Sequence, residues 1–247
     1  KRLFVFRPWD HFHRLLSSAR LLCMEPQVDE ETLTQLMVDL LHAEGWQRDV
    51  YIRPMFYKSD TGIGVRLHDL KDDLTIWSVP FQKYIKNDTN AHVTISSWRR
   101  IDDNMIPARG KISGAYVNSA LVKTDATRAG FDEALVLDQN GHVSEGSAMN
   151  VFMVRNGVVI TPPITENILE GITRRSAIEL LRNDLGMTIE ERSIDRTEVG
   201  LAEEFFMTGT AAQIVAITKV DYRPIGKGEM GPVVSKLRDL FEEIVRG

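Results

Sequence analysis

The spacing of the apolar residues along this chain changes repeatedly between a helical and a strand-like period. Residues 12–23 carry apolar side chains every three or four positions, as one buried helix face requires, and Asp10 is the predicted cap of that helix. A second helix is predicted from about Glu30 to just before Gly45. Residues 49–57 then alternate, which is typical of a strand. No regular strand–helix–strand rhythm follows, so an α+β fold is favoured over a doubly wound sheet.

The second half of the chain is predicted to be richer in strands. Residues 134–138 are predicted to form a buried strand, and the dipeptide Asn156-Gly157, which favours positive φ, is predicted to turn a hairpin between residues 151–154 and 158–160. Further strands are expected near residues 204–207 and 213–218, and helices over residues 114–127, 173–185 and 233–245.

A polar run at residues 86–90 separates two predicted strands, residues 74–81 and 92–98, and marks a candidate domain boundary. We therefore predict a small N-terminal α/β domain over residues 1–85, an interdomain loop over 86–90 and a larger domain with mixed β-structure over 91–247. The first residue is not methionine and the opening segment is too polar for a secretory signal, so we expect the small domain to begin upstream of this sequence.

Composition and motif searches exclude several classes of function. A net charge of −5 and a pI near 5.7 disfavour nucleic acid or an anionic membrane as partner. The single cysteine, Cys23, permits no internal disulfide, which fits a reducing compartment and a cytoplasmic location. The six histidines lack the spacing of a metal site, so no metal is expected. Nucleophile-elbow, dinucleotide-binding and P-loop patterns are also missing from the sequence.

Two charged residues have surroundings that suit covalent chemistry. Lys111 lies between Gly110 and the small residues 113–115, and a lysine that attacks an aldehyde must lose its proton, through burial or nearby positive charge. Glu145 follows it by 34 positions, at the end of a predicted strand. A carboxylate beside a pyridine nitrogen keeps that nitrogen protonated. Taken singly, the lysine is more often a solvated loop residue and the glutamate a turn residue.

Two turns rich in glycine and threonine are candidate phosphate sites. Residues 169–173 enter a predicted helix, whose free N–H groups and dipole attract anions, although Thr173 alone would also suit a plain helix cap. In residues 208–212, Gly209 lies between two threonines, a pattern that suits an anion-binding nest or a strand–helix turn. A lysine, a carboxylate and two phosphate-type turns together describe a pocket for pyridoxal phosphate (PLP).

Three residues near the N-terminus are candidate anion ligands. Arg14 lies on the more polar side of the first predicted helix, where it either reaches a phosphate or is simply solvated. Tyr51 and Arg53 are two positions apart and so share one face of a strand, which suits a carboxylate clamp or, alternatively, an edge-strand salt bridge. Pro54 lacks an N–H group, which predicts an edge strand or a bulge.

In their order and spacing these residues resemble the fold-type IV PLP enzymes, and most closely the branched-chain amino acid aminotransferases. The resemblance extends over essentially the whole sequence. The segments that carry it are residues 51–54, 62–65, 111–116, 143–146, 161–163, 168–174 and 207–212. One departure is Met149, where many relatives have glutamate.

The resemblance implies a role for each candidate residue. Lys111 would hold PLP as a Schiff base and move the proton of the reaction, Glu145 would pair with the pyridinium, and Tyr116 would bond the phenolic oxygen. Leu169 would pack on the ring. The implied phosphate ligands are Arg14, Gly171, Ile172, Thr173, Gly209 and Thr210. The implied substrate ligands are Tyr51, Arg53, Thr210 and Ala211 for the carboxylates and Tyr84 for the apolar pocket.

The implied reaction is ping-pong transamination between L-leucine, L-isoleucine or L-valine and 2-oxoglutarate. A homodimer or larger homo-oligomer is implied as well, acting on small amino acids and 2-oxo acids. Two rivals within the same fold are D-amino acid aminotransferase and aminodeoxychorismate lyase, and the strand Tyr51-Ile52-Arg53-Pro54 favours the branched-chain type. An alternative of another class is a protein that binds PLP without catalysis.

Overall fold

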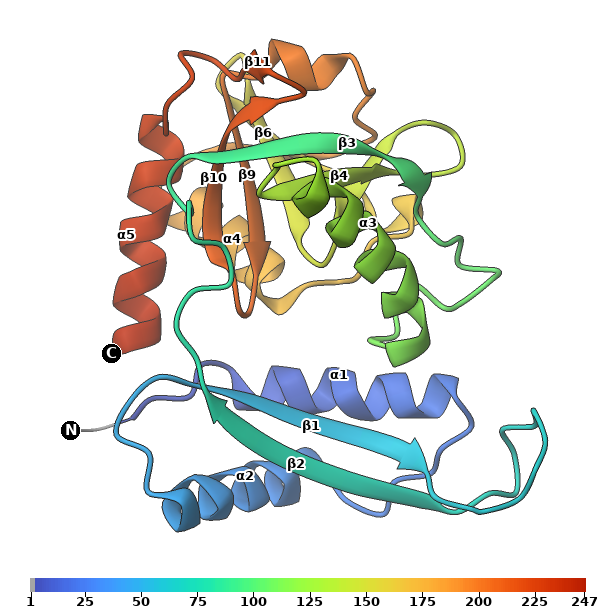
Figure 1. The fold of residues 1–247 in the computed structure, drawn as a ribbon. Coiled ribbons are helices and arrows are strands. Elements are labelled where there is room, and N and C mark those ends of the chain that lie inside the picture. Colours follow the sequence, from blue (N-terminus) through green and yellow to red (C-terminus); the bar gives the residue numbers. More distant parts are fainter. Residues whose placement is uncertain (1–2) are drawn as a thin grey trace. The chain divides into compact units, whose positions relative to one another are not determined.

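The computed structural model describes residues 3–247 and divides the chain into two compact units (Figure 1). Unit 1 ends at Gln82, and unit 2 runs from Lys83 to Gly247. The polar run at residues 86–90 therefore lies among the first residues of unit 2. Within the described residues, no helix combines the length and the apolar character that crossing a bilayer demands.

Unit 1 consists of two helices on a two-stranded antiparallel sheet. Its elements are α1 (Pro8–Leu21), α2 (Glu30–Glu44), β1 (Val50–Lys58) and β2 (Asp72–Pro80). The apolar helix faces predicted from the sequence meet in one core, in which Phe12 and Leu16 of α1 pack with Leu33 and Met37 of α2. Each of these four side chains is almost fully removed from water, which makes them the main stabilising contacts of the unit.

The ends of the two helices show which local signals decide a boundary. Helix α1 begins at Pro8, and Arg7 precedes it as the N-cap, so the prediction of Asp10 as the cap is wrong. Proline at the first helical position has a preset φ and needs no N–H partner, and Asp10 lies within the first turn, 3.8 Å from Arg7. Helix α2 follows its predicted signals, because the Asp29 carboxylate accepts the Thr32 N–H at 2.8 Å and Gly45 ends the helix.

Unit 2 is built on a nine-stranded mixed sheet. Its strands are β3 (Ala91–Arg99), β4 (Glu133–Leu137), β5 (Val143–Gly146), β6 (Asn150–Arg155), β7 (Val158–Thr161), β8 (Thr188–Glu191), β9 (Glu204–Gly209), β10 (Gln213–Val220) and β11 (Arg223–Pro224). The spatial order is β5-β4-β3-β10-β9-β6-β7-β8, with β11 added to β10. The pairs β3–β4, β3–β10 and β7–β8 are parallel and the others antiparallel, so the predicted α+β class with mixed β-structure is confirmed.

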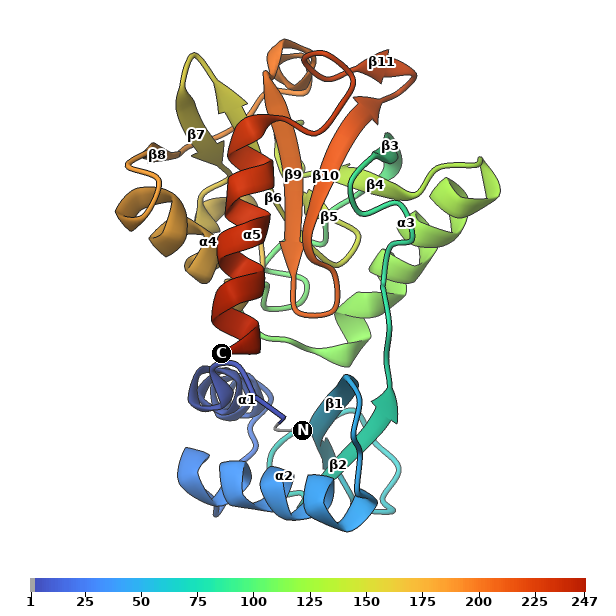
Figure 2. The same ribbon diagram turned by 90° about the vertical axis from the view of Figure 1, so that its left-hand side faces the viewer.

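Helices cover this sheet in two groups. Helix α3 (Tyr116–Arg128) packs on β3 and β4, whereas α4 (Ile172–Asn183) and α5 (Pro232–Arg246) contact each other and β9, as Figure 2 shows for α5. Three short 3₁₀ turns complete the unit, η1 (Ser113–Ala115), η2 (Ile164–Glu166) and η3 (Glu198–Leu201). The helix predicted over residues 114–127 is thus split into η1 and α3.

The core of unit 2 lies along the central strands. Phe152 of β6 and Phe206 of β9 are register partners, and their rings stack with centroids 4.8 Å apart. The predicted hairpin at Asn156-Gly157 is confirmed by the pairing of β6 with β7. Both turn residues have positive φ, 51° and 73°, which asparagine and glycine tolerate best. These strands form a rigid base from which the polar loops at their ends are positioned.

Candidate active site

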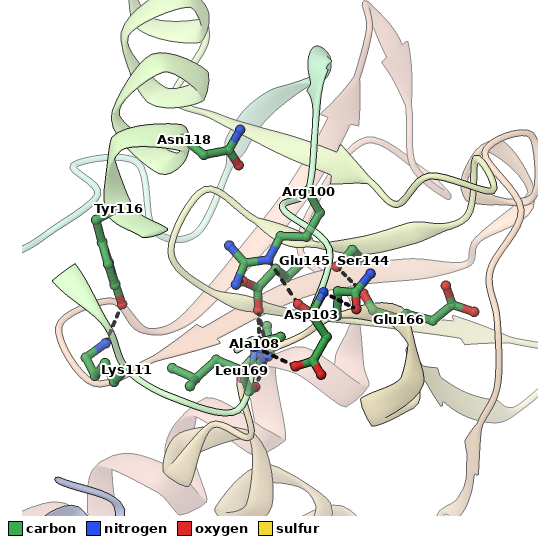
Figure 3. A network of polar contacts seen from close by, with 12 residues as sticks. Arg100, Asp103, Ala108, Lys111, Tyr116, Asn118, Ser144, Glu145, Glu166 and Leu169 are labelled. Atoms are coloured by element: carbon green, nitrogen blue, oxygen red, sulfur yellow. Dashed lines mark hydrogen bonds and ion pairs between the residues drawn. The ribbon is translucent and has the colours of Figure 1, made fainter. Parts of the chain in front are cut away.

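Lys111 and Tyr116 lie on either side of the turn η1, and their side chains meet (Figure 3). Lys111 Nζ donates to Tyr116 Oη at 2.6 Å and lies 5.0 Å from the centre of the phenol ring. The Lys111 side chain is exposed in this unit, and the tyrosine is half-buried. The turn therefore presents an accessible amine whose position is set by a phenol.

Glu145 is a buried strand residue, so its alternative interpretation as a turn residue is wrong. It belongs to β5 and is 4% exposed. Its Oε1 lies 3.0 Å from Arg100 Nη2, and its Oε2 accepts the Leu169 N–H at 3.1 Å (Figure 3). Burial raises the pKa of Glu145, while Arg100, the Leu169 N–H and Lys111 act in the opposite direction. The carboxylate is thus held in place by partners on other segments, near the lysine.

Arg100 and Asn150 are functional candidates that the sequence did not reveal. Arg100 follows β3 directly and is 8% exposed, and a buried guanidinium requires a carboxylate such as that of Glu145. Asn150 is 5% exposed and donates to the Leu169 carbonyl at 2.8 Å and to Glu145 at 3.3 Å. The adjacent arginines at the end of a predicted strand were the only signal for Arg100, and no spacing rule links Asn150 to Leu169.

The turn over residues 169–173 is the entrance to α4. Gly171 is the N-cap residue, so the interpretation of Thr173 as the cap is wrong, and Ile172 and Thr173 are the first helical residues. A Cβ at Gly171 would lie 2.0 Å from Asn150 Oδ1, which explains the need for glycine. The first N–H groups of α4 have no partner within the helix and point along its positive end, as an anion site requires.

The turn over residues 208–212 connects β9 to β10, which are antiparallel, so the strand–helix alternative is wrong. Gly209 pairs with Gln213, and a Cβ on Gly209 would lie 3.1 Å from Met149 Cγ. Thr208 is buried opposite Asn150, and among the described residues its hydroxyl has no hydrogen-bond partner. Thr210 and Ala211 occupy the tip, where Thr210 is exposed.

The remaining candidates lie partly in unit 1. On β1, Arg53 Nη2 donates to Tyr51 Oη at 3.1 Å, and its guanidinium lies over the rings of Tyr51 and Trp77, so the predicted shared face is confirmed. Arg14 is a half-buried residue of α1. Tyr84 belongs to unit 2, where its ring centre lies 5.7 Å from Lys123 Nζ. Within unit 2 the structure forms two bonded pairs, Lys111 with Tyr116 and Glu145 with Leu169, and the charge of Lys111 acts to lower the pKa of Glu145.

A second titratable cluster, formed by Asp138, His142 and Glu166, places three potential metal-ligating atoms within 4.8 Å of one another. Burial and the neighbouring Asp138 raise the pKa of Glu166. Asp138 already accepts the N–H groups of Asn140 and His142, and Glu166 accepts the Ser193 hydroxyl. We assign this cluster a structural role, because both carboxylates already accept hydrogen bonds from within the chain.

The mixed sheet of unit 2 carries an exposed amine, a buried carboxylate and a helix N-terminus suited to a phosphate, which are the groups that a PLP-dependent enzyme requires. Residues 3–220 match the sequence profile of the amino-transferase class IV family, and the chain belongs to that family. A probable branched-chain-amino-acid aminotransferase of Aquifex aeolicus is 42% identical over 247 residues, which are 100% of this chain and 79% of that protein.

Two solved structures carry the same likeness at the level of the fold. The branched-chain amino acid aminotransferase of Thermobaculum terrenum in its PLP form is 39% identical, with a TM-score of 0.92 over 98% of this chain and 79% of that one. The T.th. branched-chain amino acid aminotransferase complexed with N-(5′-phosphopyridoxyl)-L-glutamate is 37% identical, with a TM-score of 0.90 over 97% of this chain and 78% of that one.

Proposed function

We propose that this protein transfers amino groups between L-branched-chain amino acids and 2-oxoglutarate with PLP as cofactor. The observation that carries the proposal is that unit 2 holds both the Lys111 amine, bonded to Tyr116, and the buried carboxylate of Glu145. The name of the Aquifex relative supports the half-reaction of the branched-chain amino acid, and the phosphopyridoxyl-glutamate complex of the T.th. enzyme supports the other half.

The residues of unit 2 fit PLP. The cofactor needs an amine, a carboxylate for its ring nitrogen and donors for its phosphate, and the chain offers Lys111, Glu145 and the first N–H groups of α4. The buried hydroxyl of Thr208 is a further polar group whose partner is not within the described chain. Bound PLP supplies an electron sink for the electrons released at the substrate α-carbon.

Lys111 is the proposed proton carrier. Its Nζ would take the proton from the α-carbon of the amino acid and pass it to the bound cofactor, a role that requires a defined position of the amine. The hydroxyl of Tyr116, 2.6 Å away, fixes that position. Because η1 begins at Ser113 and α3 begins at Tyr116, one short turn connects the residue that carries the amine to the residue that carries the phenol.

Glu145 is proposed to hold a proton on the cofactor's ring nitrogen. Arg100 and the Leu169 N–H orient its two oxygens, so the carboxylate cannot rotate away from the position they define. Gly171, Ile172 and Thr173 would bind the phosphate at the entrance to α4, and Gly209 and Thr210 would contribute from the β9–β10 turn.

Other assignments have no contact among the described residues that tests them. Arg14 for the phosphate, Tyr51, Arg53 and Ala211 for substrate carboxylates, and Tyr84 for the apolar pocket stay predictions. So do unit 1 as the small domain and unit 2 as the cofactor domain, the homodimer or larger homo-oligomer, and the cytoplasmic location. Static light scattering of the purified enzyme measures the number of subunits.

The rivals within the fold receive less support. The names of the relatives favour the branched-chain type over D-amino acid aminotransferase and aminodeoxychorismate lyase. A protein that binds PLP without catalysis would not need an amine held 2.6 Å from a phenol in the same unit as a buried carboxylate. A substrate panel of L-leucine, D-alanine and aminodeoxychorismate separates the three enzymes.

The decisive experiment locates the lysine that holds PLP. Purified protein is reconstituted with PLP, reduced with borohydride and mapped by peptide mass spectrometry, and the label is expected on Lys111. Lys111→Ala is expected to lose the visible absorbance and the turnover, whereas the matched control Lys236→Ala, an exposed lysine of α5, keeps both. A label on another residue, or full transamination by Lys111→Ala, would overturn the proposal.

A further inference from the structure

Two loops of unit 2 carry the groups just described. The lysine segment, residues 100–111, runs from the end of β3 to Lys111. The helix-entry segment, residues 162–171, runs from the end of β7 to the N-cap of α4 and includes Leu169. The Lys111 amine, the Glu145 carboxylate and the N-terminus of α4 can act on one bound cofactor only if these two loops keep one relative position. A small misplacement of reacting groups costs a large factor in rate.

Asn167 joins the two loops at three points. Its carbonyl accepts Arg100 Nε at 3.0 Å, and its side-chain Oδ1 accepts the Asp103 N–H at 3.2 Å. Its Nδ2 donates to Asp102 Oδ2 at 3.3 Å. The orientation of the amide is fixed by chemistry, since the backbone N–H needs an acceptor and the carboxylate needs a donor.

The bonds of Asn167 continue towards the reacting groups on both sides. On the lysine segment, Asp103 Oδ1 accepts the Ala108 N–H at 2.8 Å, three residues before Lys111 (Figure 3). On the helix-entry segment, Leu169 donates its N–H to Glu145 two residues after Asn167. Asn167 thus lies between Asp103, which holds the segment leading to Lys111, and Leu169, which bonds the Glu145 carboxylate.

Backbone conformation adds a reason for this residue type. Asn167 has φ 58° and ψ 27°, the left-handed region in which asparagine and glycine are the least strained residues. That conformation turns the chain after η2 so that the carbonyl and the side chain both face the lysine segment. Glycine would keep the turn but lose both side-chain bonds.

We propose that Asn167 is a positioning residue that sets the lysine segment against the helix-entry segment, and so aligns the Lys111 amine with the Glu145 carboxylate. The inference rests on the proposed function. It assigns to Asn167 no contact with substrate or cofactor.

The first test compares two asparagine-to-glycine variants. Asn167→Gly removes the two side-chain bonds and keeps the positive φ. The matched control Asn156→Gly changes an exposed asparagine with φ 51°. The backbone N–H of residue 156 donates to Glu203, and a glycine at this position keeps that bond. For Asn167→Gly we expect kcat for L-leucine to fall about ten-fold with little change in KM, and the Kd for PLP of the cofactor-free protein to rise by a similar factor.

Stability of the cofactor-free proteins separates positioning from folding. We expect Asn167→Gly to melt less than about 8 °C below Asn156→Gly and to remain folded at the assay temperature, because it loses two hydrogen bonds but no core contact. Kinetics and PLP affinity of Asn167→Gly equal to those of Asn156→Gly would overturn the inference while leaving the proposed function intact. Wild-type protein that neither binds PLP nor transaminates would overturn the proposed function and this inference with it.

An exchange of donor and acceptor keeps the inference testable if the glycine variant does not fold. Asn167→Asp puts a second carboxylate opposite Asp102, at the place where Nδ2 now lies 3.3 Å from Oδ2, and is expected to be at least as impaired as the glycine variant. Adding Asp102→Asn restores one donor and one acceptor with their directions reversed. We expect the double variant to recover kcat and PLP affinity to within about three-fold of wild type. No recovery over Asn167→Asp would contradict the role of this contact.

Discussion

Arg100 Nη2 lies 3.0 Å from Glu145 Oε1, and the two side chains are 10% and 5% exposed. The pair joins the end of β3 to β5, although 45 residues separate the partners in the sequence. A buried charge pair adds little stability when whole, but the loss of one partner leaves an uncompensated charge away from water. Arg100 therefore stabilises the local fold and favours the charged form of Glu145, the carboxylate proposed to bind the ring nitrogen of the cofactor.

Arg100→Met is expected to lower the free energy of unfolding of the cofactor-free protein by about 3 kcal/mol, because Glu145 would lose its buried partner. Arg99→Met is the matched control, since Arg99 is exposed and its Nη1 donates to the carbonyl oxygen of Asp138, at 3.3 Å, rather than to a buried carboxylate. Urea unfolding of both variants measures the difference. An equal fall in the free energy of unfolding of both variants would show that Arg100 does not stabilise the protein through its ion pair with Glu145.

Gly171→Ala is expected to destabilise the protein by about 2 kcal/mol and to weaken PLP binding, because the new Cβ would lie 2.0 Å from Asn150 Oδ1. The control is Gly200→Ala in η3, where a Cβ meets no atom within 4 Å. Thermal unfolding and PLP titration are the measurements. The double variant Asn150→Ala/Gly171→Ala should be less destabilised than the sum of the two single variants, and strict additivity would argue against the clash.

Glu198 predicts an acid-dependent loss of stability. Its carboxylate lies 2.7 Å from Arg192 Nη2 and 2.5 Å from Arg155 Nη1, and hydrogen bonding to Arg192 lowers the pKa of Glu198 from 4.5 to about 2. The folded protein thus holds the proton less tightly than the unfolded chain. The stability that this shift confers is present above pH 4.5 and is lost as the pH falls from 4.5 towards 2.

Glu198→Gln should therefore be less stable than wild type near neutral pH, and the gap should narrow as the pH falls below about 4.5. Glu242→Gln serves as the control, because that glutamate is 53% exposed and pairs with Arg246 on the surface of α5. Urea unfolding at several pH values measures both. A gap that stays constant with pH would contradict the assigned pKa.

Arg53→Ala should raise KM for L-glutamate about ten-fold and change KM for L-leucine much less, because only glutamate has a second carboxylate for the guanidinium and the Tyr51 hydroxyl to bind. Arg20→Ala, an exposed arginine in the last turn of α1, is the control. Steady-state kinetics with both amino acids decide the matter. An equal rise for leucine and glutamate would contradict the assignment of Arg53 to the second carboxylate of glutamate.

The sequence predicted the individual helices, strands and turns better than it predicted which strands pair in the sheet. Local signals sufficed for Gly45 and the Asn156-Gly157 hairpin, because a turn or cap depends on adjacent residues. The cap at Asp10 failed because Pro8 starts the helix earlier. The turn at residues 208–212 was left open between two forms because its partner strand is decided by the whole sheet.

In the candidate site, too, residues in recognisable segments were predicted and residues whose partners are distant in the sequence were missed. Lys111, Tyr116 and Glu145 belong to segments with a recognisable order and spacing, and in unit 2 Lys111 bonds Tyr116 and its charge reaches Glu145. Arg100, Asn150 and Asn167 were missed because their partners are distant in sequence: Arg100 bonds a carbonyl 67 residues away, and Asn150 one 19 residues away. Such bonds have no local signature, since any polar side chain near a loop satisfies the same pattern.

The parallel pairing of β3 with β10 has a consequence for how this protein is made. The two strands lie side by side in the middle of the sheet, yet more than a hundred residues of chain separate Ala91 from Gln213. A nascent chain on the ribosome cannot complete the sheet until β10 has emerged, so β3, which has β4 on one edge, must wait with its other hydrogen-bonding edge unpaired. Chaperone demand during synthesis should accordingly be greatest in the interval between the emergence of β4 and that of β10.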